Sequence, residues 1–186
     1  MTQEEFEKNA EYVKSRVKSV ADFPKPGILF RDITSVCEDP KAFALTMELL
    51  AAHYRDRKID AVLCAEARGF IFGAPLSLML NCAFVPVRKP GKLPRKTIEE
   101  KYDLEYGSAV LQVHEDAVKP GQRVLLLDDL LATGGTMGAM VKLAQKLKAE
   151  IDSMAFVIEL TGLNGRKMLE DTYRHEVFSL IKFPGH

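Results

Sequence analysis

Apolar residues recur at helical spacing at the start of the chain. From Phe6 to Val20 they lie three or four positions apart, which is typical of an amphipathic helix. Thr2 and Glu5 precede this run with the spacing of a capping box. The pattern predicts one helix that opens the chain.

The helical pattern stops in residues 22–34. Two prolines and a glycine in this segment predict a loop with fixed backbone angles. Asp39 and Pro40 are typical of an N-cap and a first helical residue. Apolar positions up to Tyr54 continue one face, so we expect a second helix there.

After Asp60 short apolar runs alternate with helical segments. The predicted strands cover residues 61–64, 83–87, 109–113, 124–127 and 154–160, and the predicted helices lie near 71–80 and 136–149. Several of these strands lack polar alternation, as expected where helices cover both faces of a mainly parallel sheet. We therefore predict an α/β fold with a mainly parallel central sheet flanked by helices, whose ligands bind beyond the carboxyl ends of the strands.

Composition limits the alternatives. A chain of 186 residues with 47% hydrophobic and 28% charged residues fits one globular domain, residues 1–186. The 26 basic residues balance the 26 acidic ones, so we expect neither nucleic acid nor a membrane as partner. Cys37, Cys64 and Cys82 form no C-x-x-C pair, and the N-terminus lacks a signal-peptide pattern. Reduced thiols and a cytoplasmic location are the expectation.

The segment 88–107 interrupts the alternation. Its first half, RKPGKLPRK, contains five basic residues and no acid, whereas its second half contains four acids. Connections of this length in compact domains are commonly binding loops or lids. We expect a lid.

The strongest chemical signal is residues 124–136, where a buried strand leads to Asp128 and Asp129 and then to a glycine-rich turn that begins a helix. Backbone N–H groups at a helix N-terminus bind phosphate, and carboxylates accept hydrogen bonds from sugar hydroxyls. A ribose 5-phosphate would satisfy both parts. The candidate phosphate-binding residues are Ala132, Thr133, Gly134, Gly135 and Thr136.

Two other phosphate motifs do not fit this segment. A P-loop requires a lysine directly after its glycines, but the next lysine is Lys142. The dinucleotide fingerprint requires G-x-G-x-x-G, which the spacing of Gly134, Gly135 and Gly138 does not give. A purely structural turn with two solvated aspartates is the remaining alternative, and the flanking acids and threonines together favour a ligand site.

Five segments match, in chain order, the pattern of the type I phosphoribosyltransferases, and the chain resembles in particular those members of the family that use adenine. They are DFPKPGILFRD (22–32), EARGF (66–70), RKPGKLP (88–94), LEYG (104–107) and the 124–136 segment. The resemblance implies transfer of phosphoribose from phosphoribosyl pyrophosphate to N9 of adenine, giving AMP and diphosphate in purine salvage. It also implies a homodimer, a small hood of residues 1–34 over the base and a mobile lid of residues 88–107.

The resemblance also assigns roles to residues. Asp128 and Asp129 would hold the ribose hydroxyls, and Glu105 would handle the proton of the base. Spacing alone does not separate Glu105 from Glu99, Glu100 or Asp103. The implied diphosphate-binding residues are Arg68, Arg88, Lys89 and Lys92, of which Arg68 is also catalytic, and the implied adenine-binding residues are Leu29, Phe30, Arg31 and Leu130. A structural ion pair of Arg68 with Glu66 or Asp129 is the alternative for that residue.

Metal binding is expected through the substrate. The four histidines form no ligand spacing, so we expect no protein-built metal site. Mg²⁺ would bind the diphosphate and the ribose hydroxyls.

Two other functions share parts of this pattern. A phosphoribosyltransferase for 6-oxopurines or orotate would keep the phosphate motif, but the Phe30-Arg31-Asp32 segment argues against it. A regulator that senses phosphoribosyl pyrophosphate would need a DNA-reading module, for which the residues before Asp22 leave room for only one helix.

Overall fold

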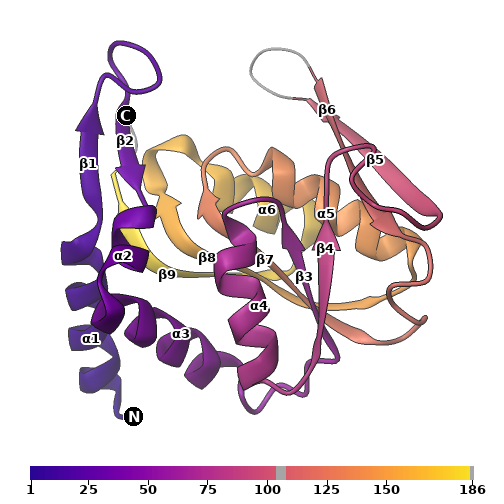
Figure 1. The fold of residues 1–186 in the computed structure, drawn as a ribbon, viewed down its shortest axis with the longest axis horizontal. Coiled ribbons are helices and arrows are strands. Elements are labelled where there is room, and N and C mark those ends of the chain that lie inside the picture. Colours follow the sequence, from indigo (N-terminus) through magenta and orange to yellow (C-terminus); the bar gives the residue numbers. More distant parts are fainter. Residues whose placement is uncertain (104–107, 185–186) are drawn as a thin grey trace.

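A five-stranded parallel sheet forms the centre of the computed structural model, which describes residues 1–103 and 108–184 (Figure 1). Its strand order is β4-β3-β7-β8-β9, and every neighbouring pair is parallel. The predicted mainly parallel sheet is confirmed. The strands are β3 (Ala61–Ala65), β4 (Ala83–Val87), β7 (Arg123–Leu131), β8 (Glu150–Leu160) and β9 (Glu176–Phe183).

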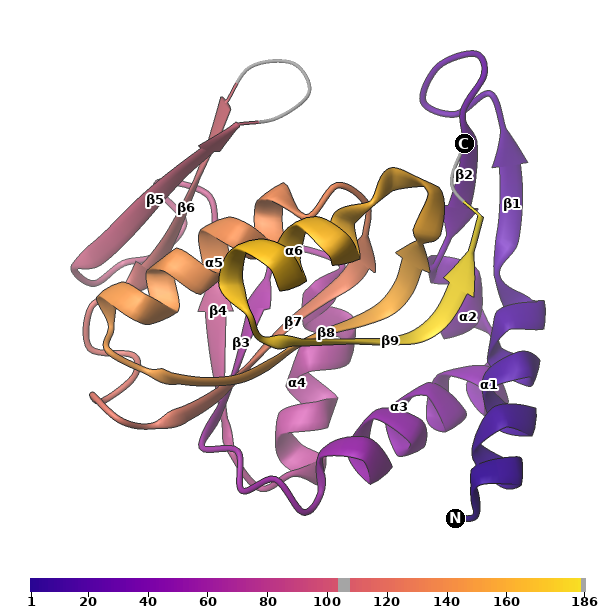
Figure 2. The same ribbon diagram turned by 180° about the vertical axis from the view of Figure 1, so that it is seen from behind.

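Helices cover both faces of this sheet (Figures 1 and 2). One face carries α1 (Gln3–Arg16), α3 (Pro40–Tyr54) and α4 (Gly69–Met79), with the short α2 (Thr34–Glu38) beside them, and the other carries α5 (Gly135–Lys146) and α6 (Gly165–Tyr173). Leu125 and Leu127 of β7 pack in the core on the first face, whereas Val124 and Leu126 pack in the core on the second. Burial on both sides explains why the sequence of β7 does not alternate.

Both predicted helix starts are confirmed. Thr2 and Glu5 form a capping box at α1, and the side chain of Asp39 accepts hydrogen bonds from the first backbone N–H groups of α3. The first helix is shorter than its apolar pattern, because it ends at Arg16 and Val20 lies in the next strand.

The prediction of a loop over residues 22–34 is wrong in part. Here β2 (Leu29–Asp32) pairs antiparallel with β1 (Lys18–Ala21), so the prolines and Gly27 occupy only the connection between two strands. Ladder hydrogen bonds to a partner strand, invisible in the local pattern, stabilise the extended backbone.

The loop predicted for residues 88–107 also contains a strand. In the structure β5 (Thr97–Asp103) pairs antiparallel with β6 (Ser108–His114), so the strand predicted at 109–113 belongs to this separate two-stranded arm and not to the central sheet. Glu100 of the arm forms ion pairs with Lys142 and Lys146 of α5, at 3.2 and 2.7 Å. These pairs attach the arm to helix α5.

The hairpin formed by β1 and β2 and the arm formed by β5 and β6 stand on opposite sides of the carboxyl ends of the parallel strands (Figures 1 and 2). This is the edge where the sequence placed its ligand site. In the part of the chain that the structure describes, no helix is both long enough and apolar enough to cross a membrane.

Candidate active site

Three hollows meet at this edge of the sheet. The turn hollow, about 100 Å³, lies over the end of β7 and the start of α5. The central cleft, about 460 Å³, lies beside it, and the hairpin pocket, about 490 Å³, lies under the β1–β2 hairpin. Leu130 lines all three, and Arg68 lines both the cleft and the pocket. Together they form one trough.

The turn hollow contains the predicted phosphate-binding residues. Ala132, Thr133, Gly134, Gly135 and Thr136 all line it. Gly134 is the N-cap of α5 with φ +89°, and no side chain caps this helix, so its first backbone N–H groups are available to an anion. A Cβ on Gly134 would lie 2.6 Å from Met168 Cε. The turn therefore requires glycine for its conformation and for its packing.

The two aspartates lie within β7, not after it, and they differ in surroundings. Asp129 is only 5% exposed and accepts a hydrogen bond from Arg68 Nε at 2.5 Å. Asp128 is partly exposed and lines both the turn hollow and the central cleft. Burial, and next the charge of Asp129, raise the pKa of Asp128 well above its usual value. Of the two, only Asp128 is among the residues that line the turn hollow.

Substitution of Asp128 tests whether its raised pKa lowers the stability of the fold at neutral pH. The pKa of Asp128 is higher in the folded state than in the unfolded state, where it is about 3.9. The contribution of this carboxyl to the free energy of unfolding is therefore complete below the unfolded pKa and is lost as the pH rises through the folded pKa. Asp128→Asn should abolish that loss, so we expect the melting temperature at pH 7 to rise by about 2–4 °C, equivalent to about 1 kcal/mol, while affinity for phosphoribosyl pyrophosphate falls. Calorimetric melting at pH 4 and pH 7 and titration with the ligand measure the two effects.

Asp129→Asn is the matched comparison, because it removes the negative charge and with it the ion pair with Arg68. We expect weaker binding of phosphoribosyl pyrophosphate. Unchanged affinity in the Asp129 variant would contradict the ribose role of that residue, and an unchanged or lowered melting temperature in the Asp128 variant would contradict the charge argument.

Arg68 lies directly before α4, and its guanidinium stands between the cleft and the hairpin pocket. Burial opposes its charge, but Asp129 outweighs burial and raises the pKa of Arg68. Its Cζ lies 5.9 Å from the ring centre of Phe30, within the range of a cation–π contact. Asp129 and Phe30 thus hold a permanent cation at the middle of the trough.

The other predicted diphosphate-binding residues are placed unequally. Lys89 lines the central cleft. Arg88 donates through Nε to Glu66 Oε2 at 2.6 Å, and Glu66 also accepts from the backbone N–H of Lys89 at 3.2 Å. Lys92 is exposed, and the residues that line the cleft include neither it nor Arg88. The sequence indicated Glu66 only as a partner of Arg68, and its contacts with Arg88 and Lys89 were missed because these residues lie more than twenty positions away.

The hairpin pocket brings together all four predicted adenine-binding residues, Leu29, Phe30, Arg31 and Leu130. The ring of Phe30 packs edge-on against Phe23 with centroids 5.1 Å apart. Leu160, Leu163 and Pro184 complete the wall and were not predicted. Only tertiary structure reveals them, since they come from the far end of the chain.

Glu105 lies outside the described residues. Two of its alternatives in the arm have other contacts: Glu99 accepts a hydrogen bond from Gln112 at 3.0 Å, and Glu100 pairs with two lysines. Tyr102, also in the arm, lines the central cleft. Its aromatic ring was not singled out in the sequence.

Within residues 1–103 and 108–184, no group of three or more His, Cys, Asp or Glu side chains is arranged to hold a metal ion. The two carboxylates of the cleft, Asp128 and Asp129, can accept hydrogen bonds from metal-bound water. They fit an ion that arrives with its ligand.

Comparison with known proteins agrees with this geometry. Residues 32–185 match the phosphoribosyl transferase domain family. The chain is 56% identical over 176 residues to the curated adenine phosphoribosyltransferase of Klebsiella pneumoniae, covering 95% of this chain and 96% of that one.

Solved structures are also similar. The adenine phosphoribosyltransferase of Thermoanaerobacter pseudethanolicus superposes with a TM-score of 0.88 at 51% identity, over 94% of this chain and 99% of that one. The Saccharomyces cerevisiae enzyme, complexed with an imino-altritol bisphosphate and adenine, gives 0.87 at 35% identity over the same shares.

Proposed function

The chain belongs to the phosphoribosyl transferase domain family, and from that premise we propose that it transfers the 5-phosphoribosyl group of phosphoribosyl pyrophosphate to N9 of adenine, giving AMP and diphosphate. The observation that carries this is the 56% identity over 95% of the chain with a curated adenine phosphoribosyltransferase. The place of the protein is therefore in purine salvage.

The trough supports an assignment of each part of the substrates. The 5′-phosphate would bind the N–H groups of the turn hollow, the ribose hydroxyls Asp128 and Asp129, and the base the hairpin pocket. The diphosphate would lie in the central cleft against Arg68 and Lys89, with Arg88 and Lys92 on its rim.

Chemistry then proceeds at the anomeric carbon. The bond from C1 to the diphosphate oxygen breaks, the bond from N9 to C1 forms, and N9 loses its proton. Negative charge grows on the diphosphate, and Arg68 stabilises it. Glu105 accepts the proton of the base, and the arm excludes water that would otherwise capture the cationic sugar. Mg²⁺ bound to the diphosphate would neutralise part of the leaving-group charge.

Base selection follows from the hairpin pocket. Backbone groups of Leu29 and Arg31 would read the amino edge of adenine, since a wrong base leaves buried polar groups unpaired. Phe30 would stack on the base. The one-domain organisation, with residues 1–34 as a hood and 88–107 as a lid, is part of the proposal.

A single assay tests the proposal. Magnesium-dependent release of diphosphate from phosphoribosyl pyrophosphate is measured with adenine, hypoxanthine, guanine and orotate offered in parallel. We expect turnover with adenine alone. Turnover with another base would discard the base assignment, and tight binding of phosphoribosyl pyrophosphate without turnover would favour a sensor.

We propose a homodimer formed through α4 and the edge strand β4. The outer face of α4 is apolar: Leu78 is 82% exposed, Met79 45% and Ile71 37%. Apolar side chains grouped on one exposed face commonly mark an interface. The three free cysteines fit a reducing compartment, and we propose the cytoplasm.

Leu78→Glu should convert the dimer to a monomer, because a charge would enter the centre of the apolar face. Sedimentation velocity measures the change. Val20→Glu, at an exposed apolar position of β1, is the control and should remain dimeric. A dimeric Leu78 variant would place the interface elsewhere.

A further inference from the structure

Helix α6 packs directly behind the phosphate-binding turn. A Cβ on Gly165, the first residue of α6, would lie 2.2 Å from the carbonyl oxygen of Ala132. From the other side, a Cβ on Gly134 would lie 2.6 Å from Met168 Cε and 3.1 Å from Leu169 Cγ. The two backbones therefore approach more closely than any side chain would allow. A displacement of α6 must displace the turn, because packed interiors transmit strain.

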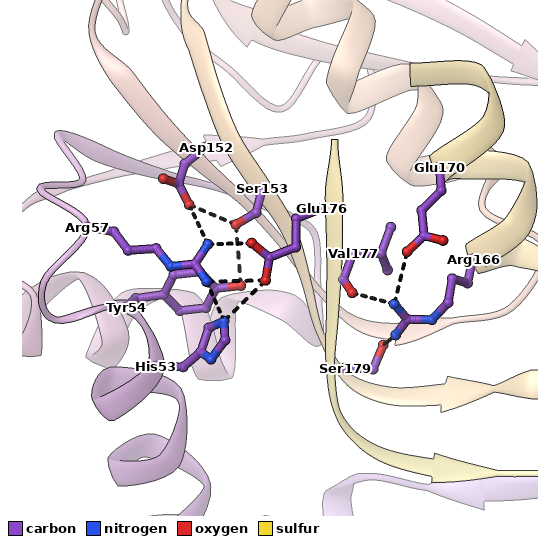
Figure 3. Close-up of polar contacts among 10 residues, drawn as sticks. All are labelled: His53, Tyr54, Arg57, Asp152, Ser153, Arg166, Glu170, Glu176, Val177 and Ser179. Carbon is purple, nitrogen blue, oxygen red and sulfur yellow. Dashed lines mark hydrogen bonds and ion pairs between the residues drawn. The ribbon is translucent and has the colours of Figure 1, made fainter. Parts of the chain in front are cut away.

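One side chain fixes the first turn of α6 to the sheet. Arg166 donates from Nη2 to Glu159 Oε2 at 2.6 Å and from Nε to both carboxylate oxygens of Glu159 at 3.0 and 3.2 Å. It also donates to the carbonyl oxygen of Val177 and to Ser179 Oγ, both on β9, and to Glu170 Oε1 (Figure 3). Arg166 thus binds α6 to two strands at once.

Glu159 keeps its negative charge beside Arg166 although it is buried. Glu159 is only 4% exposed. Burial would raise its pKa, but hydrogen bonds from Arg166 and Ser179 outweigh burial and hold the pKa of Glu159 below its usual value. The guanidinium of an arginine can donate two parallel hydrogen bonds to a buried carboxylate and so fixes the relative orientation of the two side chains. A lysine has no such paired donors and cannot reproduce this geometry.

The location of the pair connects it to the ligand site. Glu159 is in register with Leu131 of β7, the residue directly before Ala132. Arg166 is not among the residues that line the turn hollow, so it does not reach the ligand itself.

We propose that Arg166 is a positioning residue for the 5′-phosphate: by fixing α6 to β8 and β9, it holds the backbone N–H groups of the turn in their anion-binding arrangement. The inference rests on the proposed function, because it concerns the phosphate of that substrate.

The test compares the affinities of AMP and adenosine by titration calorimetry, since the two differ only in the 5′-phosphate. Arg166→Lys keeps the charge and removes the fork. We expect the ratio of AMP to adenosine affinity to fall about 10–100-fold, by analogy with the loss of a residue that orients a metal ligand, with adenosine affinity unchanged. A merely structural role would lower the melting temperature and leave this ratio as in the wild type.

Two further variants keep the test decisive if the lysine variant folds poorly. Arg166→Met with Glu159→Met replaces the buried pair by apolar side chains of similar size, and Gly165→Ala pushes on Ala132 with the Arg166 contacts intact. Both should lower the ratio. Glu170→Gln changes only the exposed partner of Arg166 and should leave it unchanged.

The outcomes separate the two proposals. A wild-type protein that binds AMP no better than adenosine would overturn the proposed function. A wild-type preference for AMP that persists in the Arg166 and Gly165 variants would overturn the role of Arg166 alone.

Discussion

Arg68→Ala is expected to lower kcat for AMP formation by about 10²–10³, the loss seen when a preorganised group that stabilises transition-state charge is removed. Arg68 lines both the central cleft and the hairpin pocket, which is where the proposed function places the leaving diphosphate. Asp129 orients it through a 2.5 Å hydrogen bond before substrate arrives. Little reorganisation is then needed at the moment of reaction.

Steady-state kinetics with both substrates measure this effect. Because the charge on the diphosphate grows in the transition state, the loss should fall on kcat more than on the KM for adenine. Arg68→Lys should recover only part of the rate, since a lysine lacks the fork. Arg95→Ala is the control: Arg95 pairs with Asp116 at 3.1 Å on the surface and should stay within about twofold of wild type, as expected for an exposed pair. Near wild-type turnover in Arg68→Ala would contradict its catalytic role.

Local pattern was sufficient for the phosphate turn. The apolar run of β7, the acids and the glycines are contiguous, so all five residues predicted to bind phosphate line one hollow, whereas Leu131, Met137 and Phe156 of its lining were not predicted. The one error in this segment was to end the strand at Leu127. Acidic residues usually mark the end of a buried strand, but β7 continues to Leu131 because its pairing with β8 continues through Leu130 and Leu131.

Contacts distant in sequence were not predictable in this way. The strands β2 and β5 depend on antiparallel partners, and the sequence around them contains prolines or many charges that favour a loop. The hairpin-pocket wall at Leu160, Leu163 and Pro184 and the Arg166 contacts arise only after β8, α6 and β9 pack together. The sequence left open whether Arg68 pairs with Glu66 or with Asp129, and only the packed structure shows that its partner is Asp129, sixty-one residues away.

Glu105→Gln is expected to lower kcat by about 10²–10⁴, the usual contribution of general acid–base catalysis. The amide keeps the size of the side chain but cannot accept the proton that N9 of adenine loses. The choice of Glu105 rests on the family resemblance; of the other acids of the segment, Glu99 and Glu100 are engaged by Gln112 and by the lysines of α5.

The dependence of kcat on pH distinguishes a proton-transfer role from a binding role. The wild-type kcat should fall at low pH as the carboxylate of Glu105 becomes protonated. The Glu105→Gln variant should lose this low-pH limb, while its affinity for phosphoribosyl pyrophosphate stays unchanged. Glu99→Gln, on the same arm, is the matched control and should keep both the rate and the limb. A full rate in Glu105→Gln would remove this residue from the mechanism and leave Asp103 as the next acid to test.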